Sequence, residues 1–408
     1  MSERDVVIPS RLRGGFFLYL LTSILLFSLL LLTGSSRTAY AEADLIQEAG
    51  RAAVLDTLLH NAVRRGLISG AVVLVGNRKE TLYIQAIGRA GFEKNARPLT
   101  LSTVFDVASL TKVFATTPAI IRLMDQGSLS LLDPVSRWFP EFIGSDITIL
   151  NLLTHTSGLH DAMLDQNAPL ASAIHHAAVK SGTIKPGTYF QYADINFILL
   201  GNLVRRITSM GLDQYCRESF YTPLNMGHTG FNPGIKTDTA ATLGGRDGVL
   251  SGIVQDPNAR LLGGVAGHAG LFSTAGDLGR FARMLLNGGT LDGRSVLSAR
   301  AVSQMTAPYY FKKGQIVRGL GWDRESPFSS PKGTHFSEVS YGHTGYSGTS
   351  VWIDPESDLY VVLLTTRINY TNRRSFNRLR SDISTAAAVL FARQEQRAAS
   401  QMLKNTGS

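Results

Sequence analysis

The chain has 408 residues, with 44% apolar and 17% charged residues, which is the composition of a globular protein of about two structural lobes. These values exclude a disordered or collagen-like chain. The net charge of +9 is spread along the sequence without basic runs and interleaved aromatics, so we expect no nucleic-acid partner. Cys216 is the only cysteine, which excludes an intrachain disulfide and predicts a packed apolar side chain.

The first 41 residues are expected to form a signal peptide or a membrane anchor. Three arginines precede residues 16–33, an uncharged run that as a helix would cover roughly 27 Å, near the minimum for a bilayer span. Ala39 and Ala41 then form the small-residue pattern of a signal-peptidase site. We therefore predict an exported chain, periplasmic or otherwise extracytoplasmic. Either the segment is cleaved or it anchors the protein to the inner membrane.

Secondary-structure signals follow in three blocks. A helical stretch over 45–66 precedes two β-rich runs, "GAVVLVGN" and "ETLYIQAIG", which predict a hairpin. Helical periodicity then dominates from 109 to about 290, and Pro118 predicts a kink or a missing hydrogen bond in the first of these helices. Strands return at 348–355 and 358–366 as a second hairpin, before a last helix.

These blocks predict an α/β protein of the α+β type. Its antiparallel sheet is built from both chain ends and flanked by helices, with an all-helical domain inserted between them. We expect one domain over 42–400, in which 42–105 and 290–400 form the sheet part and 106–289 the mainly helical part. Residues 401–408 are expected to be a frayed tail.

The segment "VFDVASLTKVFATT" places Ser109 three positions before Lys112 at the expected start of a helix. Residues three apart share a helix face, so the amine can reach a hydroxyl that is a weak nucleophile until its proton is removed. The unpaired N–H groups at a helix start also favour a nearby oxyanion. The spacing predicts a nucleophile and its activating neighbour.

A serine–lysine pair with this spacing is weak evidence by itself, because a chain of this length contains roughly one by chance. Ser329 and Lys332 have the same spacing in "FSSPKG", but a Pro/Gly loop gives no means of holding the amine over the hydroxyl. Two further elements favour the first pair. Tyr192 precedes a helix in "PGTYFQYADINFILLG", and His343 opens a strand in "YGHTGYSGTSVWIDP".

The order of these elements resembles the serine hydrolases related to class C β-lactamases and low-molecular-weight penicillin-binding proteins. The resemblance covers about residues 50–395 and rests on "SLTK", "LLTHTSGL", "YADINFILLG", "GHAGLFSTAGDL" and "HTGYSGTSVWIDP". It implies a β-lactamase/transpeptidase-like fold and an acyl-enzyme formed without a cofactor. No metal site is expected either, because "HExxH" is absent from the sequence.

The resemblance also implies roles for particular residues. Ser109 would be acylated, while Lys112 and Tyr192 would share proton transfer, with the acylation base left open. His343, Thr344 and Gly345 would form the strand motif that lines the site. The backbone N–H groups of Ser109 and Tyr346 would form the oxyanion hole. His155 and His268 lie in family-like segments, and we expect them to shape loops through hydrogen bonds.

Two residues depart from the family pattern. Asp194 stands where the Y-x-N motif has asparagine, and a carboxylate cannot donate a hydrogen bond to a substrate carbonyl. It would favour charged Lys112. His343 stands where K-T-G has lysine and would be a weaker, pH-dependent cation. Arg367 after the last strand is a candidate to replace the lost charge in part, but we expect it to be a surface residue.

The sequence thus predicts an exported serine hydrolase that acts on D-amino-acid peptides, as a DD-carboxypeptidase does, or on small esters. The alternatives are a β-lactamase and a penicillin-binding sensor that is acylated without turnover. The expected partners are a small peptide, ester or β-lactam substrate, peptidoglycan, and the membrane if the N-terminal segment is retained.

Overall fold

The computed structural model describes residues 50–392, except 235–236, 313–315 and 369. The predicted N-terminal segment 1–41 and the tail 401–408 lie outside these residues. The chain divides into two units, Met1–Val54 and Leu55–Ser408, and every element named below belongs to the second. In the first unit, residues 50–54 are helical. No helix in the described part of the chain is long and apolar enough to span a bilayer.

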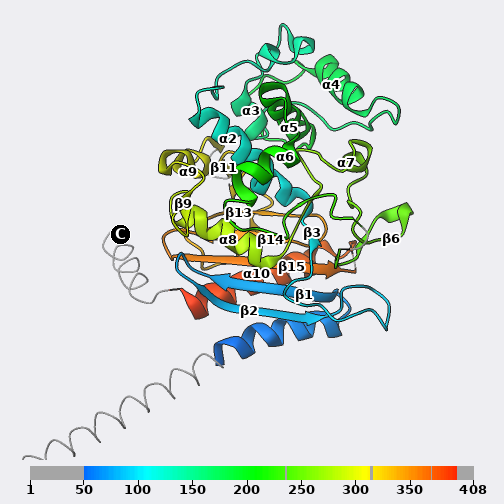
Figure 1. Ribbon diagram of the computed structural model, residues 1–408, viewed down its shortest axis with the longest axis vertical. Helices are drawn as coiled ribbons and strands as arrows, with labels where there is room; N and C mark the ends of the chain where they lie inside the picture. The colour runs from blue at the N-terminus through cyan, green and yellow to red at the C-terminus, as the bar shows by residue number, and fades with distance from the viewer. Residues whose placement is uncertain (1–49, 235–236, 313–315, 369, 393–408) are drawn as a thin grey trace, which may run out of the picture. The chain divides into compact units, whose positions relative to one another are not determined.

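An eight-stranded antiparallel sheet joins the two ends of the second unit (Figure 1). β1 (Ile68–Gly76) lies between β2 (Thr81–Gly88) and β15 (Leu359–Arg367). The sheet continues from β15 through β14 (Ser350–Asp354), β13 (Tyr341–Thr344), β12 (Asp323–Glu325), β11 (Ile316–Arg318) and β10 (Tyr310–Lys312). The sheet built from both chain ends is confirmed, as are its two predicted hairpins.

Helices cover both faces of this sheet, which explains why its central strands are apolar without alternation. All nine residues of β15 are buried. Val72 and Leu74 of β1 pack into one hydrophobic core, whereas Ala71, Val73 and Val75 pack into another. The second core also contains residues of helix 55–64 and of α10 (Arg373–Phe391). On the other face α8 (Ala275–Leu286) packs against β1 and β15.

The remaining helices form a second layer above the sheet (Figure 1). They are α2 (Thr117–Asp125), α3 (Ile149–Leu153), α4 (Pro169–Lys180), α5 (Ile195–Thr208), α6 (Leu212–Cys216), α7 (Pro257–Leu261) and α9 (Ala299–Thr306). Short 3₁₀ turns occur at Val135–Arg137, Pro140–Phe142, Gly245–Asp247 and Ser330–Lys332, and a π-helical turn at Arg217–Tyr221.

Three small sheets complete the fold. β3 (Phe105–Asp106), β7 (Leu271–Ser273) and β4 (Gly230–Phe231) form one, and β7 is its central strand. The others are the pairs β5 (Thr242–Leu243) with β6 (Val249–Leu250) and β8 (Thr290–Leu291) with β9 (Arg294–Ser295). The first is the one that matters for the site, because β3 leads directly into the turn that carries Ser109.

The helical segment after Ser109 changes type along its length. A 3₁₀ turn (Ala108–Leu110) is followed by a π-helical turn (Lys112–Thr116), and α2 begins at Thr117. Pro118 lies in the first turn of α2 and has no N–H to donate to the carbonyl of Phe114. That carbonyl accepts the Tyr221 hydroxyl instead, at 3.1 Å. The predicted irregularity is therefore present, and it lies on the N-terminal side of the proline.

Candidate active site

The turn that carries Ser109 is held from several sides. The Asp106 carboxylate accepts the backbone N–H of Ala108 at 2.8 Å. The N–H of Leu271 in β7 donates to the Thr111 hydroxyl at 3.0 Å, and this hydroxyl donates to the Ala108 carbonyl at 2.7 Å. Ala108 adopts φ +48, a left-handed conformation that a residue with a Cβ rarely adopts and that is common at functional sites. The serine is therefore presented by a fixed backbone.

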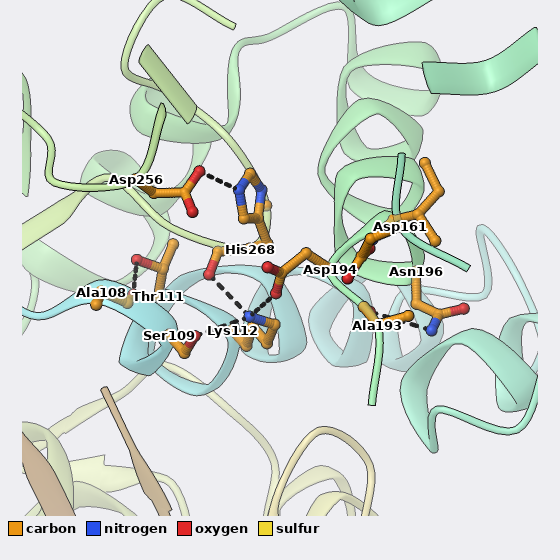
Figure 2. Close-up of polar contacts among 12 residues, drawn as sticks. Ala108, Ser109, Thr111, Lys112, Asp161, Ala193, Asp194, Asn196, Asp256 and His268 are labelled. Atoms are coloured by element: carbon orange, nitrogen blue, oxygen red, sulfur yellow. Dashed lines mark hydrogen bonds and ion pairs between the residues drawn. The ribbon is translucent and has the colours of Figure 1, made fainter. Parts of the chain in front are cut away.

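Lys112 lies one turn later, and its side chain has no exposed area. Its Nζ is 3.1 Å from Ser109 Oγ, 3.0 Å from the carbonyl oxygen of His268 and 2.7 Å from Asp194 Oδ1 (Figure 2). These three acceptors match the three N–H bonds of an ammonium group. Burial alone would lower the pKa of Lys112, but the charge of Asp194 outweighs it and raises the pKa above its usual value. Lys112 is thus a cation in the resting site.

Tyr192 lies on the loop before α5, with its ring centroid 5.0 Å from Lys112 Nζ. Burial raises the pKa of Tyr192, while the charge of Lys112 and hydrogen bonds with Lys112 and Ser109 oppose that rise. The phenol therefore stays protonated at neutral pH and can donate a proton to a departing group. The structure brings Ser109, Lys112 and Tyr192 together as the sequence motifs predicted.

His155, for which we expected a structural role, stacks on the Tyr192 ring at 4.4 Å between centroids. Its Nδ1 accepts the backbone N–H of Ala193 at 3.3 Å, so the imidazole holds the segment that carries the tyrosine. Burial, with the charges of Arg318 and Lys112, keeps the pKa of His155 well below its usual value. The ring is therefore a neutral support for the phenol.

His268 connects Lys112 to a second pair that the sequence did not reveal. His268, whose backbone carbonyl accepts the Lys112 ammonium, places its Nε2 2.9 Å from Asp256 Oδ1 (Figure 2). Burial favours a raised pKa for Asp256, but the hydrogen bond with His268 lowers it, so this carboxylate is ionised. Asp256 and His268 are twelve positions apart in the sequence, and no motif spacing indicates the pair.

Asp194, Asp256 and His268 are also close enough for their ligand atoms to share a cation, since these atoms lie within 4.8 Å of one another. The Lys112 ammonium already lies 2.7 Å from Asp194 and would repel a metal ion there. The group therefore fits a charge network around the lysine better than it fits a metal site.

The strand motif faces Ser109 from β13 and the turn after it. The Thr349 hydroxyl donates to the Val107 carbonyl at 3.0 Å, and the Ser347 hydroxyl donates to the Asp106 carbonyl at 2.7 Å. These two bonds join the turn directly to the segment before the serine. No acceptor in the described part of the chain takes the backbone N–H of Tyr346, which leaves this group available to an oxyanion.

Gly345 is required at this junction for steric reasons. A Cβ built on it would lie 2.1 Å from Thr349 Oγ1 and 2.5 Å from the Val107 carbonyl oxygen, and the latter is backbone that cannot move aside. The Arg380 guanidinium fixes the same turn by donating to the carbonyls of Gly345 and Thr349, both at 2.7 Å. Thr344 ends β13 beside this glycine.

His343 is not the pH-dependent cation that we expected. It is buried, and its Nδ1 donates to the Thr344 carbonyl at 2.9 Å, since a carbonyl oxygen can only accept. Burial lowers the pKa of His343 well below its usual value, and the charges of Arg318 and Lys112 lower it further. His343 is therefore neutral and leaves Nε2 as an acceptor.

The expectation that Arg367 is a surface residue is also wrong. Only 6% of it is exposed, because its guanidinium packs over the rings of Phe376 and Tyr370, at 4.3 and 4.6 Å from their centroids. It lines a cavity that also includes Ser109. β15, the last strand in chain order, thus brings a guanidinium to the cavity that contains the nucleophile.

Two cavities meet at Ser109, Tyr192 and Tyr346. The first, of about 610 Å³, also contains Asp194, Asp256 and His268, and we call it the acidic cavity. The second, of about 280 Å³, is lined by Arg318, Arg367, Arg373 and Arg380, and we call it the arginine cavity. The nucleophile lies on the boundary between them.

The second serine–lysine pair has no comparable geometry. Ser329 Oγ donates to Glu325 Oε1 at 3.0 Å and to the Ser326 carbonyl at 2.8 Å. The Lys332 ammonium lies 2.6 Å from the Glu325 carboxylate. Glu325 thus engages both side chains and keeps the lysine from activating the serine.

Comparisons with known proteins show what this chain is similar to. The family model described as "Beta-lactamase" matches residues 55–385. A "Putative D-alanyl-D-alanine carboxypeptidase" of Escherichia coli (strain K12) is 31% identical over 66% of this chain and 70% of its own. An "N-acetylmuramyl-L-alanine amidase" of Bacillus subtilis (strain 168) is 30% identical over 77% of this chain and 80% of its own. A solved class C beta-lactamase in complex with cefoxitin superimposes with a TM-score of 0.68 at 22% identity, covering 82% of this chain and 98% of its own.

Proposed function

We propose, from the premise that this chain belongs to the beta-lactamase family of serine hydrolases, that it is a D-amino-acid peptidase of the DD-carboxypeptidase type. The observation that carries the proposal is the position of Ser109 Oγ, 3.1 Å from the buried Lys112 ammonium and at the boundary of two cavities. Support for the substrate class comes from the names of the Escherichia coli and Bacillus subtilis relatives, which denote a carboxypeptidase and an amidase.

In this proposal Ser109 Oγ attacks the carbonyl carbon of the scissile amide. Its proton must be accepted, and Lys112 is the nearest amine, so Lys112 first releases a proton to solvent by way of Asp194, whose carboxylate lies 2.7 Å from Nζ and is partly exposed. The neutral amine then accepts the Ser109 proton and later passes it to Tyr192, to which it is hydrogen-bonded. The developing oxyanion is stabilised by the backbone N–H groups of Ser109 and Tyr346. Tyr192 donates a proton to the leaving nitrogen, and water then hydrolyses the acyl-enzyme.

Replacing Ser109 with alanine tests the nucleophile. S109A should lose both D-alanine release from a peptide ending in D-Ala-D-Ala and labelling by a fluorophosphonate. The matched control is S329A, because Ser329 shares the spacing to a lysine but bonds to Glu325 instead. Labelling of S109A at full strength would overturn the assignment.

The rival activities are separated by the choice of substrate. D-Ala-D-Ala peptides, nitrocefin and p-nitrophenyl esters are compared on one preparation, and fluorescent penicillin is chased over time. The proposal expects turnover of the D-peptide with slow release of the penicillin adduct. Hydrolysis of esters alone would identify an esterase, fast hydrolysis of nitrocefin a β-lactamase, and a permanent adduct without peptide turnover a sensor. Any of these three results would overturn the carboxypeptidase assignment.

The proposal extends to the cellular location. Residues 16–33, which support export in the sequence, lie outside the described residues. Peptides that end in D-amino acids belong to the cell wall, so an extracytoplasmic enzyme fits the proposed substrate. Fractionation of cells, with mass spectrometry of the N-terminus, tests this location. A cytoplasmic protein that retains residues 1–41 would contradict it.

A further inference from the structure

The pair formed by Asp256 and His268 lines the acidic cavity with Ser109 but takes no part in the proposed steps. His268 is only 1% exposed, and its Nε2 is 2.9 Å from Asp256 Oδ1. An ionised carboxylate can only accept, so Nε2 carries the proton of this bond. The other ring nitrogen, Nδ1, is buried and has no hydrogen-bond partner in the described part of the chain. Nδ1 is therefore able to accept a proton.

The carboxylate that holds the imidazole is itself fixed by the backbone. Oδ1 of Asp256 also accepts the N–H of Ala259 at 2.7 Å, at the start of α7. The preceding N–H, that of Gln255, donates to the buried Asp106 carboxylate at 2.7 Å, and the same carboxylate holds the turn that carries Ser109. Asp256 thus keeps a constant position beside this turn, and its bond to Nε2 determines which ring nitrogen stays available.

Asp194 lies close enough to pass a proton between Lys112 and this pair. One carboxylate oxygen of Asp194, one of Asp256 and one ring nitrogen of His268 lie within 4.8 Å of one another (Figure 2). A single water molecule can bridge such a span. The Asp194 carboxylate is also 2.7 Å from the Lys112 ammonium. It therefore lies near both the amine that must lose a proton and the imidazole that can accept one.

The positive charge of Lys112 acts on the imidazoles around it. Burial is the main cause of the low pKa values of His155 and His343, and the charges of Arg318 and Lys112 add to it. The His268 carbonyl lies 3.0 Å from the same ammonium, so a second positive charge on His268 is opposed in the same way. While Lys112 is charged, a proton on His268 Nδ1 is thus disfavoured.

The balance reverses when Lys112 loses its proton. Asp194 and Asp256 are then two neighbouring carboxylates without the ammonium that compensated them. A proton on His268 Nδ1 restores a positive charge beside both, and it removes no charge from the cavity as a whole. The cluster therefore favours one extra proton, which either Lys112 or His268 can hold.

Other charged and titratable groups near the pair do not compete for this proton. Arg260 in α7 pairs with Asp247. Burial raises the pKa of Asp106 to about 6, but this carboxylate already accepts two backbone N–H groups. The remaining titratable side chains that line the acidic cavity are phenols, which stay protonated at neutral pH: Tyr192, Tyr346 and Tyr370. Among the described residues of this cavity, His268 is thus the acceptor that fits.

We propose that the imidazole of His268, paired with Asp256, holds the proton that Lys112 releases. Asp194 takes this proton from the ammonium and passes it to His268 Nδ1, so that an imidazolium forms beside Asp256. Neutral Lys112 then serves as the base for Ser109, and after deacylation the proton returns to Lys112 by the same route. This inference rests on the proposed roles of Ser109 and Lys112 and deepens them, but it does not depend on the substrate.

Nitrogen NMR of the histidine rings tests the proposal without a substrate. In K112M the ammonium is gone, so His268 Nδ1 should carry a proton at pH 7 that it lacks in the wild-type enzyme. The signal is assigned with H268Q. The control K332M alters the lysine beside Glu325 and should leave the signal unchanged. If Nδ1 has the same protonation state in wild type and K112M, the proposal is overturned.

The pH dependence of fluorophosphonate labelling tests the same step in kinetics. The amide of H268Q can still donate to Asp256 but cannot hold a second proton. We expect its labelling rate at pH 7 to fall about 10- to 100-fold and the rising limb of the profile to move to higher pH, because Lys112 must then lose its proton to solvent. D256N should move the limb in the same direction. The control is H176Q, since His176 is exposed on α4 and lines neither cavity.

These measurements separate the inference from the proposed peptidase activity. Labelling does not depend on the natural substrate. A shifted profile in an enzyme that cleaves no D-peptide would keep the role of His268 and overturn the peptidase assignment. If H268Q, D256N and H176Q all keep the wild-type rates and pH profile, the role of His268 is overturned even for an active peptidase. Thermal unfolding checks each variant, and D256N supplies the kinetic test if H268Q does not fold.

Discussion

The acidic and arginine cavities share Ser109, Tyr192 and Tyr346, yet their other charged residues have opposite signs. Asp194 and Asp256 belong to the acidic cavity, and each is paired with a neighbouring basic side chain, Lys112 or His268. In the arginine cavity Asp323 engages Arg318, and the positive charge exceeds the negative. The difference indicates a division of labour. On the acidic side Asp194 raises the pKa of Lys112, whereas guanidinium groups predominate on the arginine side.

This division explains how the two departures from the family pattern coexist. Asp194 adds an anion where an amide was expected, and the lysine retains its proton as a result. His343 removes a cation from the strand motif, while buried Arg367 brings one to the same cavity from the next strand but one in the sheet order. The charges around the site therefore include residues outside the motifs, which a comparison of motif positions alone does not consider.

Removing Lys112, the cation that Asp194 stabilises, should have the largest effect on activity. K112M takes away the group that activates Ser109, and we expect kcat/KM to fall by about 10²- to 10⁴-fold. The control K332M alters the other serine–lysine pair, where the lysine lies beside Glu325, and should leave kcat/KM unchanged. Hydrolysis rates are measured with thermal unfolding of each variant in parallel. A K112M enzyme that is folded and within tenfold of wild type would contradict the role of the lysine.

Replacing Asp194 should shift the pH dependence of acylation, which tests how the acidic cavity controls Lys112. Burial lowers the pKa of Lys112, and the charge of Asp194 is the largest contribution that raises it, so the pKa falls in D194N. If acylation needs neutral Lys112, the rising limb of the pH–rate profile moves to lower pH by about 1–3 units. Acylation rates of wild type and D194N are compared across pH. A profile that stays in place, or moves to higher pH, would exclude this coupling.

The smallest effect concerns two buried neutral histidines whose rings lie beside that of Tyr192. His343 and His155 have pKa values well below normal, so the unfolded chain binds more protons than the native state below about pH 6.5. Stability present above that pH is therefore lost as pH falls. H343Q should reduce the slope of unfolding free energy against pH by at most about one proton between pH 5 and 6.5. Urea titrations across this range measure the slope, and an unchanged slope would show that His343 binds protons equally in the native and unfolded states.

The parts of the site that could be predicted from the sequence depend on short-range spacing or on motif order. Ser109 and Lys112 lie within one helical turn, so their distance follows from local geometry. The Asp256–His268 pair had no such signal, because a loop brings the two side chains together. The four arginines lie on two strands and a helix, and only the tertiary structure places them around one cavity.

The fold follows the same rule. β1, β2, β14 and β15 are long or strongly apolar, and the two hairpins were predicted from these patterns. β10, β11 and β12 have three residues each, which is too short for an alternating pattern, so they were missed. The sequence predicts that the helix after Ser109 starts near Leu110. The 3₁₀ and π turns found there depend on contacts with distant residues, such as the hydrogen bond that the Tyr221 hydroxyl donates to the Phe114 carbonyl.

The pairing of β1 with β15 has a consequence for biosynthesis. Ile68 faces Arg367 across the sheet, so the partner of β1 is translated about 300 residues later. At roughly 5–20 residues per second, an apolar strand waits on the order of 15–60 s for the neighbour that covers its edge. The turn that carries Ser109 is also incomplete until then. Ser347 and Thr349, which anchor it to the strand motif, belong to the same late-translated part of the chain. The contacts that complete the Ser109 turn therefore form only after most of the chain has been translated.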